Sequence, residues 1–431
     1  MTDAKAPPRH ESAPASTRAW DNRDFRRLWT GSAVSTFGSE VAELAVPLLA
    51  IAVLAATPGE LGALRTAQFL PFLLATLPLG MLVDRRRRLP LMIGADVGRF
   101  ALILVIPIAV WAGLAEIELL YVVMFLAGVL TVLYQVADFA FVPEVVTAHQ
   151  LVDANGKLAA AHSANEIGAR GFGGLLVQAA SAPVAMLVNA VAYLASALSL
   201  RGIAVVETAR PAASTRPSWA EVTAGLREAL RNRFVRALLG EATTFNLFNE
   251  VFLLGLMLFT VREVGLSPVQ LGIVFTAGGV GSFLGAWFGS RVTGRFGYGR
   301  VLLITLALGN TAPVLVALAG TDAAGTMTLF CSVFVVMGVG IGIANVHAVT
   351  LRQAALPDEL RGRVNAAYRL ISWGAIPVGA SLGGLLAGLT DGRTAMVAGA
   401  CGMVLATLWV AFSPVRRLAS IDEAARLSRA S

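Results

Sequence analysis

One spacing recurs in this sequence and constrains its fold. Asn155 precedes a Gly-Gly-Leu-Leu run at 173–176, and 210 residues later Asn365 precedes the same run at 383–386. The chain is 56% hydrophobic and only 14% charged, so its 431 residues cannot present a polar surface to water and lipid must be the solvent. We therefore expect an all-α polytopic membrane protein built from a duplicated helical bundle.

Twelve membrane spans can be placed, because a spanning helix needs about 20 largely apolar residues. An even number puts both termini on one side of the membrane. Of the 34 Lys and Arg residues, 29 fall on that side, which by the positive-inside rule predicts cytoplasmic termini. The spans are expected at 28–55, 61–83, 89–114, 118–142, 154–180 and 183–204 in the first half, and at 234–261, 268–292, 300–320, 324–351, 362–389 and 393–413 in the second.

The same placement divides the chain into five regions. Residues 1–22 form a polar tail without the apolar core of a signal peptide, and we expect it to be disordered and cytoplasmic. Residues 23–204 and 234–413 form two six-helix bundles, and residues 414–431 a second cytoplasmic tail. The linker at 205–233 ends in a predicted amphipathic helix, whose apolar residues are Trp219, Val222, Leu226 and Leu230. This helix either lies along the membrane interface or against the helical bundle, or it docks a partner protein.

Several other classes of protein are disfavoured. The net charge of +7 comes from short segments between spans rather than from one patch, so no nucleic-acid partner is expected. Cys331 and Cys401 lie in apolar stretches, which predicts neither a disulfide nor a metal site. No HExxH, Walker or nucleophile-base motif is present, so we expect neither an enzyme nor a cofactor, and transport energy must come from a gradient. Two lysines against 32 arginines suggest a GC-rich genome and a bacterial inner membrane.

The connection between spans 2 and 3 carries a family signature. Residues 80–88 read Gly-Met-Leu-Val-Asp-Arg-Arg-Arg-Arg and resemble the Gly-x-Leu-x-Asp-Arg motif of the major facilitator superfamily; 289–300 resembles a degenerate copy, with Thr293 near the place of the acid. A Gly allows close helix approach, and an Asp can accept from a helix N-terminus and neighbouring Arg side chains. The resemblance implies a cytoplasmic gate, for which the candidates are Gly80, Asp84, Arg85, Arg88 and, low in span 4, Asp138.

Within that superfamily, the chain resembles the branch of the enterobactin exporter and macrolide efflux proteins from about residue 23 to 418. The strings that carry the resemblance are at 143–146, 151–155, 351–353, 357–365 and 413–418. It implies two six-helix bundles around a central substrate site, and outward transport of hydrophobic small molecules in exchange for protons. One departure is that Ala169-Arg170 stands where antiporter branches usually carry Gly-Pro, which puts a standard antiporter cycle in doubt.

Ionisable residues inside the spans are candidate functional residues, because each costs about 2.5 to 3.5 kcal/mol at the bilayer centre. Glu40 and Glu43 are three apart and share a face of span 1. Glu250, after Asn246 and Asn249, lies near the middle of the equivalent span 7. These carboxylates either bind protons or a cationic substrate, or serve as structural hydrogen-bonding groups.

Further charged groups form possible pairs within single helices. Glu166 and Arg170, four apart in span 5, would be either a self-neutralised pair or a latch or anion contact. Asp96 and Arg99 in span 3 suggest a similar pair. The histidines of spans 5 and 10, His162 and His347, are typical of hydrogen-bonded packing residues, with proton relay as the alternative.

The function predicted from the sequence is proton-coupled efflux of a hydrophobic small molecule by alternating access. Its partners would be the lipid bilayer, protons and the substrate, and the protein is expected to be a monomer. Import of a small metabolite and a non-transporting receptor with the same fold remain alternatives.

Overall fold

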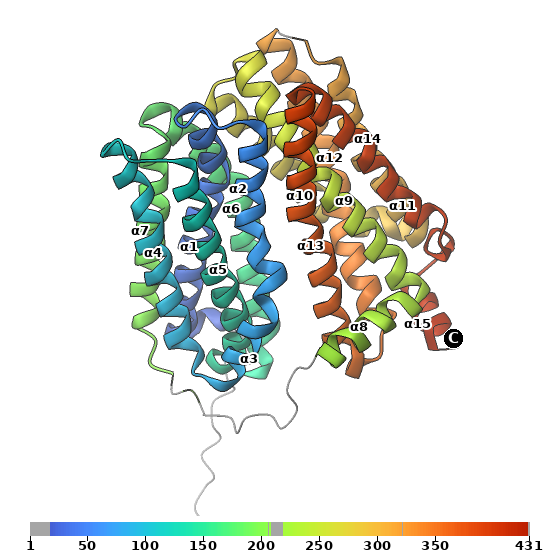
Figure 1. The fold of residues 1–431 in the computed structure, drawn as a ribbon. Helices are drawn as coiled ribbons and strands as arrows, with labels where there is room; N and C mark the ends of the chain where they lie inside the picture. The colour runs from blue at the N-terminus through green and yellow to red at the C-terminus, as the bar shows by residue number, and fades with distance from the viewer. Residues whose placement is uncertain (1–17, 206, 208–218, 321, 430–431) are drawn as a thin grey trace, which may run out of the picture.

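The computed structural model describes residues 18–205, 207, 219–320 and 322–429, and in these residues the secondary structure is entirely helical (Figure 1). The first half contains α1 (Arg23–Ala52), α2 (Pro58–Leu74), α3 (Thr76–Arg85), α4 (Arg88–Trp111), α5 (Ile117–Val145), α6 (Leu151–Ala179) and α7 (Ala182–Arg201). The second half contains α9 (Arg233–Leu258) with the π-helical turn η3 (Phe259–Val264), α10 (Pro268–Phe296), α11 (Tyr298–Thr311) with η4 (Ala312–Leu318), α12 (Ala323–Ala354), α13 (Asp358–Leu389) and α14 (Gly392–Ala411).

Every predicted span coincides with a helix or a broken helix. In the described residues, ten helices are long and apolar enough to cross a membrane, and α2 with α3 makes an eleventh span bent by 49°. Pro78 lacks the N–H that would continue the helical bonding across this bend. The twelfth span is α6, which carries the charged residues Asp153, Lys157, Glu166 and Arg170. Because α6 packs between α1 and α10, its polar side chains can face these helices instead of lipid.

The segments outside the spans differ in part from the prediction. Residues 1–17 lie outside the described residues, but 18–22 are folded, with η1 at Ala19–Asp21. The backbone N–H of Ala19, which is buried, donates to the carboxylate of Asp153 at 2.7 Å. The prediction of a disordered tail up to residue 22 is therefore wrong for its last residues, because the start of α6 binds them.

Helices α8 (Trp219–Arg231) and α15 (Ile421–Arg429) flank the second half. The predicted amphipathic helix is α8, and it packs against α13, where the backbone of Arg363 leaves no room for a side chain at Gly225. This contact agrees with docking on the bundle. The side chains of Trp219 and Val222 lie outside the described set.

The two halves repeat the same contacts at a spacing of 210 residues. Asn22 caps α1, and its side-chain amide donates to the carbonyl of Val145 at the end of α5 at 2.6 Å. Asn232 caps α9 in the same way and donates to the carbonyl of Ala355, which follows α12, at 2.9 Å. Such caps satisfy orphan N–H groups at the start of a helix. The duplication therefore preserves the local chemistry that places each bundle's first helix.

The repeated Gly-Gly runs lie where the two halves meet. A Cβ on Gly174 of α6 would be 2.3 Å from the carbonyl oxygen of Pro268 at the start of α10. Its counterpart Gly384 of α13 lies as closely against the start of α2, where a Cβ would be 2.9 Å from the Pro58 carbonyl oxygen. Only glycine allows backbones to approach this closely. We call this end of the molecule the far side, since it is opposite the ends that carry α3, α8 and both described termini (Figure 1).

Two threonines continue the same contacts toward the middle of the bundle. Thr66 Oγ1 of α2 donates to the carbonyl of Pro377 in α13, and Thr276 Oγ1 of α10 donates to the carbonyl of Ile167 in α6, both at 3.1 Å. Each bond joins the two halves, and the two are related by 210 residues. The halves therefore meet along two equivalent seams, α2 with α13 and α6 with α10.

The buried core shows that the halves are closed against each other only on the far side. The largest buried cluster includes Val41, Leu44 and Leu48 of α1 and Leu254, Leu256 and Leu258 of α9, and so draws on both halves. Toward the terminus side the buried residues instead separate into one cluster confined to 19–203 and another confined to 229–424. The structure therefore opens toward the side that carries the termini.

We expect Gly174→Ala to shift the protein toward a state open on the far side, because the added methyl group would collide with the Pro268 carbonyl. The measurement is the distance distribution between spin labels at positions 114 and 318, both exposed on the far side, in a Cys331→Ser, Cys401→Ser background. Gly168→Ala is the matched control, since a Cβ there has nothing within 4 Å. Identical distributions in both variants would contradict the role assigned to this contact.

Candidate functional site

A cavity of about 840 Å³ lies between the halves. Its first-half wall is polar and comes from α1, α2, α4, α5, α6 and α7. Its second-half wall, from α9, α10, α12 and α13, is mainly apolar and aromatic and includes Phe245, Leu253, Met257, Phe275, Phe334, Met337 and Trp373. A ligand in this cavity would therefore meet charge on one side and apolar surface on the other.

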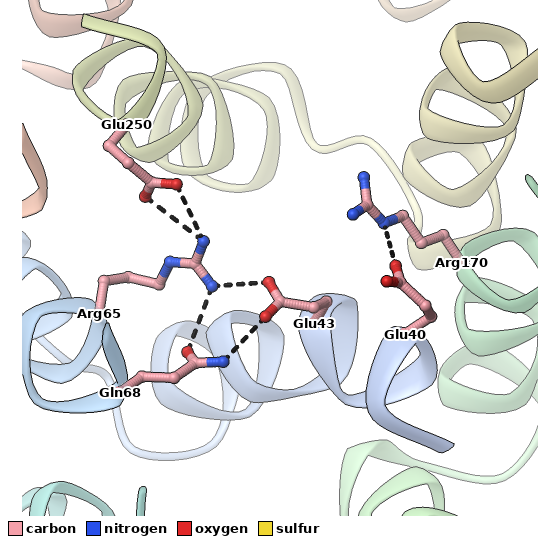
Figure 2. A network of polar contacts seen from close by, with 6 residues as sticks. All are labelled: Glu40, Glu43, Arg65, Gln68, Arg170 and Glu250. Carbon is pink, nitrogen blue, oxygen red and sulfur yellow. Dashed lines mark hydrogen bonds and ion pairs between the residues drawn. The ribbon is translucent and has the colours of Figure 1, made fainter. Parts of the chain in front are cut away.

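Arg65 is the centre of the polar network in the cavity (Figure 2). Its Nη1 lies 2.7 Å from Glu43 Oε2 of α1, and its Nη2 lies 3.2 and 3.3 Å from the two carboxylate oxygens of Glu250 in α9. Gln68, one turn further along α2, accepts from Arg65 at 3.2 Å and donates to Glu43 at 2.9 Å. One guanidinium thus binds a carboxylate from each half, and it faces the cavity.

Glu250 is the most enclosed member of this network, with 6% of the residue exposed. An ion pair out of bulk water holds its partners tightly, and removing one partner leaves the other charge uncompensated. The contact between Arg65 and Glu250 is also the part of the network that crosses between the halves. It therefore links the charge state of the cavity to the relative position of the two bundles.

Arg170 forms a second ion pair, with Glu40 of α1 (Figure 2). The Nε to Oε2 distance is 2.9 Å, and the guanidinium carbon lies 5.8 Å from the ring centre of Phe275. The predicted pairing of Arg170 with Glu166 is wrong, because the Arg170 side chain crosses to the neighbouring helix instead of folding along its own. Glu166 lines the same cavity and adds to the negative charge around Arg170.

The two ion pairs are related by the duplication but are built differently. Glu40 and Glu250 are 210 residues apart and occupy equivalent positions in α1 and α9. The counterpart of Arg65 is Phe275, and the counterpart of Arg170 is Ala380. Each half therefore contributes one glutamate at this position, whereas Arg65 and Arg170 both come from the first half. Pseudo-symmetry places two equivalent carboxylates in the cavity, and the neutralising cations break that symmetry.

A third charged group lies on the first-half wall. Asp96 and Arg99 of α4 form the pair that their spacing predicts, and the guanidinium lies between the rings of Tyr134 and Tyr193. Asp138 of α5 also lines the cavity. Among the described residues no ion pair joins Asp138 to Arg85 or Arg88, and its part in the Gly80–Arg88 charge cluster stays a prediction.

The other gate candidates lie at the terminus-side end of the first half. Asp84 and Arg85 end α3 and are exposed, and a Cβ on Gly80 would meet nothing within 4 Å. Arg88, in contrast, is buried: its side chain lies 3.3 Å from Glu144 and its backbone N–H donates to Glu207 at 2.6 Å. Arg88 thus anchors the start of α4 within its own half, whereas the side chains of Asp84 and Arg85 are exposed.

The remaining candidates divide between the cavity and the packed core. Asn249 lines the cavity, whereas the Asn246 side chain donates to the carbonyl of Ser372 at 2.7 Å and ties α9 to α13. His162 also lines the cavity. His347 is buried against Thr293, the residue near the missing acid of the degenerate motif, and is therefore a packing residue, as its surroundings predict.

Three residues that line the cavity were not predicted from the sequence, namely Arg65, Gln68 and Arg369. In the structure, Arg369 lines the cavity and its guanidinium carbon lies 4.8 Å from the ring centre of Trp373. The sequence does set Arg65 apart, because the residue 210 positions later is Phe275. This difference between the two halves does not show which side chain Arg65 binds.

Comparison with known proteins now gives the family. The chain matches the profile of the Major Facilitator Superfamily over residues 28–377 and 242–428. It belongs to this superfamily. The protein is therefore a membrane transporter rather than an enzyme, and the sequence-based prediction of the twelve-helix fold is confirmed. The finer resemblance to enterobactin and macrolide exporters stays a prediction.

Individual relatives support the same family. The MFS-type transporter YfiS of Bacillus subtilis (strain 168), itself uncharacterised, is 26% identical over 387 residues, covering 85% of this chain and 87% of YfiS. Among solved structures, the nucleoside transporter NupG is 12% identical with a TM-score of 0.72, covering 90% of this chain and 99% of NupG. An inward-facing bacterial homologue of the iron transporter ferroportin is 17% identical with a TM-score of 0.72, covering 90% of this chain and 98% of the homologue. These two structures share the fold.

We expect Arg65→Gln to lower the free energy of unfolding by about 3 kcal/mol, because Glu43 and Glu250 would then face each other without a cation. Adding Glu250→Gln should recover at least about 1 kcal/mol, since it removes one of the two stranded charges. Equilibrium unfolding in mixed micelles measures both. Arg369→Gln is the control, because it also removes a cation that lines the cavity, but Arg369 forms no ion pair among the described residues. If the double variant is less stable than Arg65→Gln alone, the network is not the source of the effect.

Proposed function

We propose that this transporter exports a hydrophobic or amphipathic small molecule in exchange for protons, by alternating access. The observation that carries the proposal is the position of Arg65, held between Glu43 of its own half and Glu250 of the other half. The cavity supports the substrate class, because about 840 Å³ lined by charge on one wall and aromatic and aliphatic side chains on the other suits a drug-sized amphipathic molecule. The resemblance to the enterobactin and macrolide exporters supports the direction.

Proton coupling follows from competition for the same carboxylates. A proton on Glu250 removes its charge and with it the attraction that joins Arg65 to the second half. A cationic or hydrogen-bonding substrate that binds Glu43 or Glu250 displaces Arg65 in the same way. Proton and substrate therefore exclude each other, which is the requirement for exchange. One proton moving down a 100 mV potential supplies about 2.3 kcal/mol.

The gate is proposed at the end of α3. When the terminus side closes, Asp84 and Arg85 come within reach of the second half and form contacts that the present conformation lacks. Gly80, with open space around it here, allows the other bundle to approach. Asp138 remains within the cavity as a further proton or cation site. We further propose cytoplasmic termini in a bacterial inner membrane and a monomeric transporter, both from the charge distribution and the fold.

We expect purified protein in liposomes to move a lipophilic dye such as Hoechst 33342 against its gradient when a pH gradient is imposed. Glu250→Gln should reduce this driven flux at least tenfold, because the variant side chain cannot exchange a proton, while dye binding weakens less than the flux, since Glu43 and the apolar wall remain. Fluorescence reports both quantities. Glu263→Gln is the matched control, since Glu263 lies on the same span, is exposed and does not line the cavity.

The other outcomes of that experiment discriminate between functions. Undiminished driven flux in Glu250→Gln would contradict coupling through this residue. Accumulation in the opposite direction would identify an importer. Binding without flux, for every compound tested, would favour a non-transporting receptor.

We expect Asp84→Asn to increase the fraction of protein that is closed on the far side, because it removes a contact made only in the opposite conformation. Spin labels at positions 114 and 318 report the change, and dye transport should fall with it. Arg86→Gln is the control, because Arg86 is exposed at the end of the same helix and is not among the gate candidates. A far-side distance distribution unchanged from wild type would argue against a gating role for Asp84.

A further inference from the structure

A second hollow lies on the outside of the second half, away from the transport cavity. It has a volume of about 460 Å³ and lies between the start of α9 and the end of α14. None of its lining residues lines the transport cavity. Because α9 begins and α14 ends on the terminus side, the groove lies at that edge of the membrane-spanning region. Its lining residues are Arg233, Arg236, Ala237, Leu405, Leu408, Trp409, Phe412, Ser413 and Pro414.

The α14 wall of the groove is apolar and uncovered. Leu408, Trp409 and Phe412 are exposed, the last at 84%. The Trp409 indole N–H donates to Thr244 Oγ1 of α9 at 3.0 Å, and a Cβ on Gly240 would be 2.3 Å from the indole ring. The ring is therefore held flat against α9 in space that only glycine provides. Aromatic side chains in this position are typical of the membrane interface.

The α9 wall is cationic. Arg233 and Arg236 are three residues apart and share a helix face. Within the described part of the chain, no carboxylate lies within ion-pairing distance of either, and no carboxylate lines the groove. The Nε of Arg233 is buried and has no hydrogen-bond partner among the described residues. Guanidinium groups in this arrangement match a phosphate, which can accept from both at once.

The equivalent place in the first half lacks these features. Arg23 and Arg26 are the 210-residue counterparts of the two arginines, but Ser199 and Gly202 stand where the second half has Trp409 and Phe412. The nearby Arg27 is already bound by Asp24 and by the Gly202 carbonyl. The groove is thus not a by-product of the fold. It is specific to the second half, where aromatic side chains and unpaired arginines occur together.

We propose that this groove binds an anionic phospholipid, with the phosphate between Arg233 and Arg236 and an acyl chain along Leu408, Trp409 and Phe412. The cationic α9 wall and the apolar α14 wall lie next to each other, as the head group and the acyl chains do in a lipid. A soluble anion would use the arginines but leave the aromatic wall uncovered, whereas a lipid covers both. The site is independent of the transport cavity and of its substrate.

The test compares lipids on the purified full-length protein in detergent. Dioleoyl phosphatidylglycerol should raise the thermal unfolding midpoint saturably, and Arg233→Gln/Arg236→Gln should require at least about tenfold more of this lipid for half the effect. Arg23→Gln/Arg26→Gln, the matched first-half variant, should behave as wild type. Equal protection by dioleoyl phosphatidylcholine, or an unchanged requirement in Arg233→Gln/Arg236→Gln, would overturn the proposal. Equal protection by inorganic phosphate would show a free-anion site instead of a lipid site.

A second measurement leaves both arginines in place, and so does not depend on whether the double variant folds. Brominated phosphatidylglycerol quenches tryptophan fluorescence at contact. We expect quenching of the wild type to exceed that of Trp409→Phe at lipid concentrations where brominated phosphatidylcholine shows no such difference. Equal quenching of the two proteins by brominated phosphatidylglycerol would mean that no anionic lipid occupies the groove.

Discussion

The ion pair between Arg65 and Glu250 is the interaction on which the arrangement of the cavity depends. Among the described residues it is the ion pair that joins the halves, and it lies beside the seams formed by α2 with α13 and α6 with α10. The seams themselves are close contacts of glycine backbones and hydrogen bonds from threonine hydroxyls to backbone carbonyls, which are tight but carry no charge. Packing of this kind stabilises a closed state without making it responsive to a ligand. A charged contact adds that response, because a proton or a substrate can remove it.

Gene duplication explains the symmetric part of this design. Residues 210 apart cap equivalent helices, pack equivalent glycines and place Glu40 and Glu250 at equivalent depths. If the symmetry were complete, both acids would meet the same partner. Instead Phe275 occupies the counterpart of Arg65, and Arg170 reaches Glu40 from α6. The consequence is that Glu40 is neutralised within its own half and Glu250 from across the interface, so of these two ion pairs the one with Glu250 depends on the separation of the halves.

The sequence predicted the fold well because its main signals are local. Span length, the even count and the repeated Gly-Gly runs each depend on a short stretch of chain. The site was predicted only in part. Glu40, Glu43 and Glu250 were found because a carboxylate in an apolar span stands out, but pairing depends on helix rotation and on neighbours far apart in sequence. Spacing therefore suggested Glu166 for Arg170, while the structure gives Glu40, 130 residues away.

The same reasoning explains why the cavity can be both polar and stable. On the first-half wall, the guanidinium groups of Arg65, Arg99 and Arg170 each have a carboxylate partner at hydrogen-bonding distance, which offsets part of their desolvation cost. Glu250 belongs to the mainly apolar second-half wall and contacts Arg65 of the first half. Opening of the far side would draw Glu250 away from Arg65. Unless a proton or a substrate replaces the lost contact, the movement leaves an unpaired carboxylate in a poorly hydrated place. In the proposed mechanism, this cost opposes conformational change of the empty, unprotonated transporter and thereby couples one flux to the other.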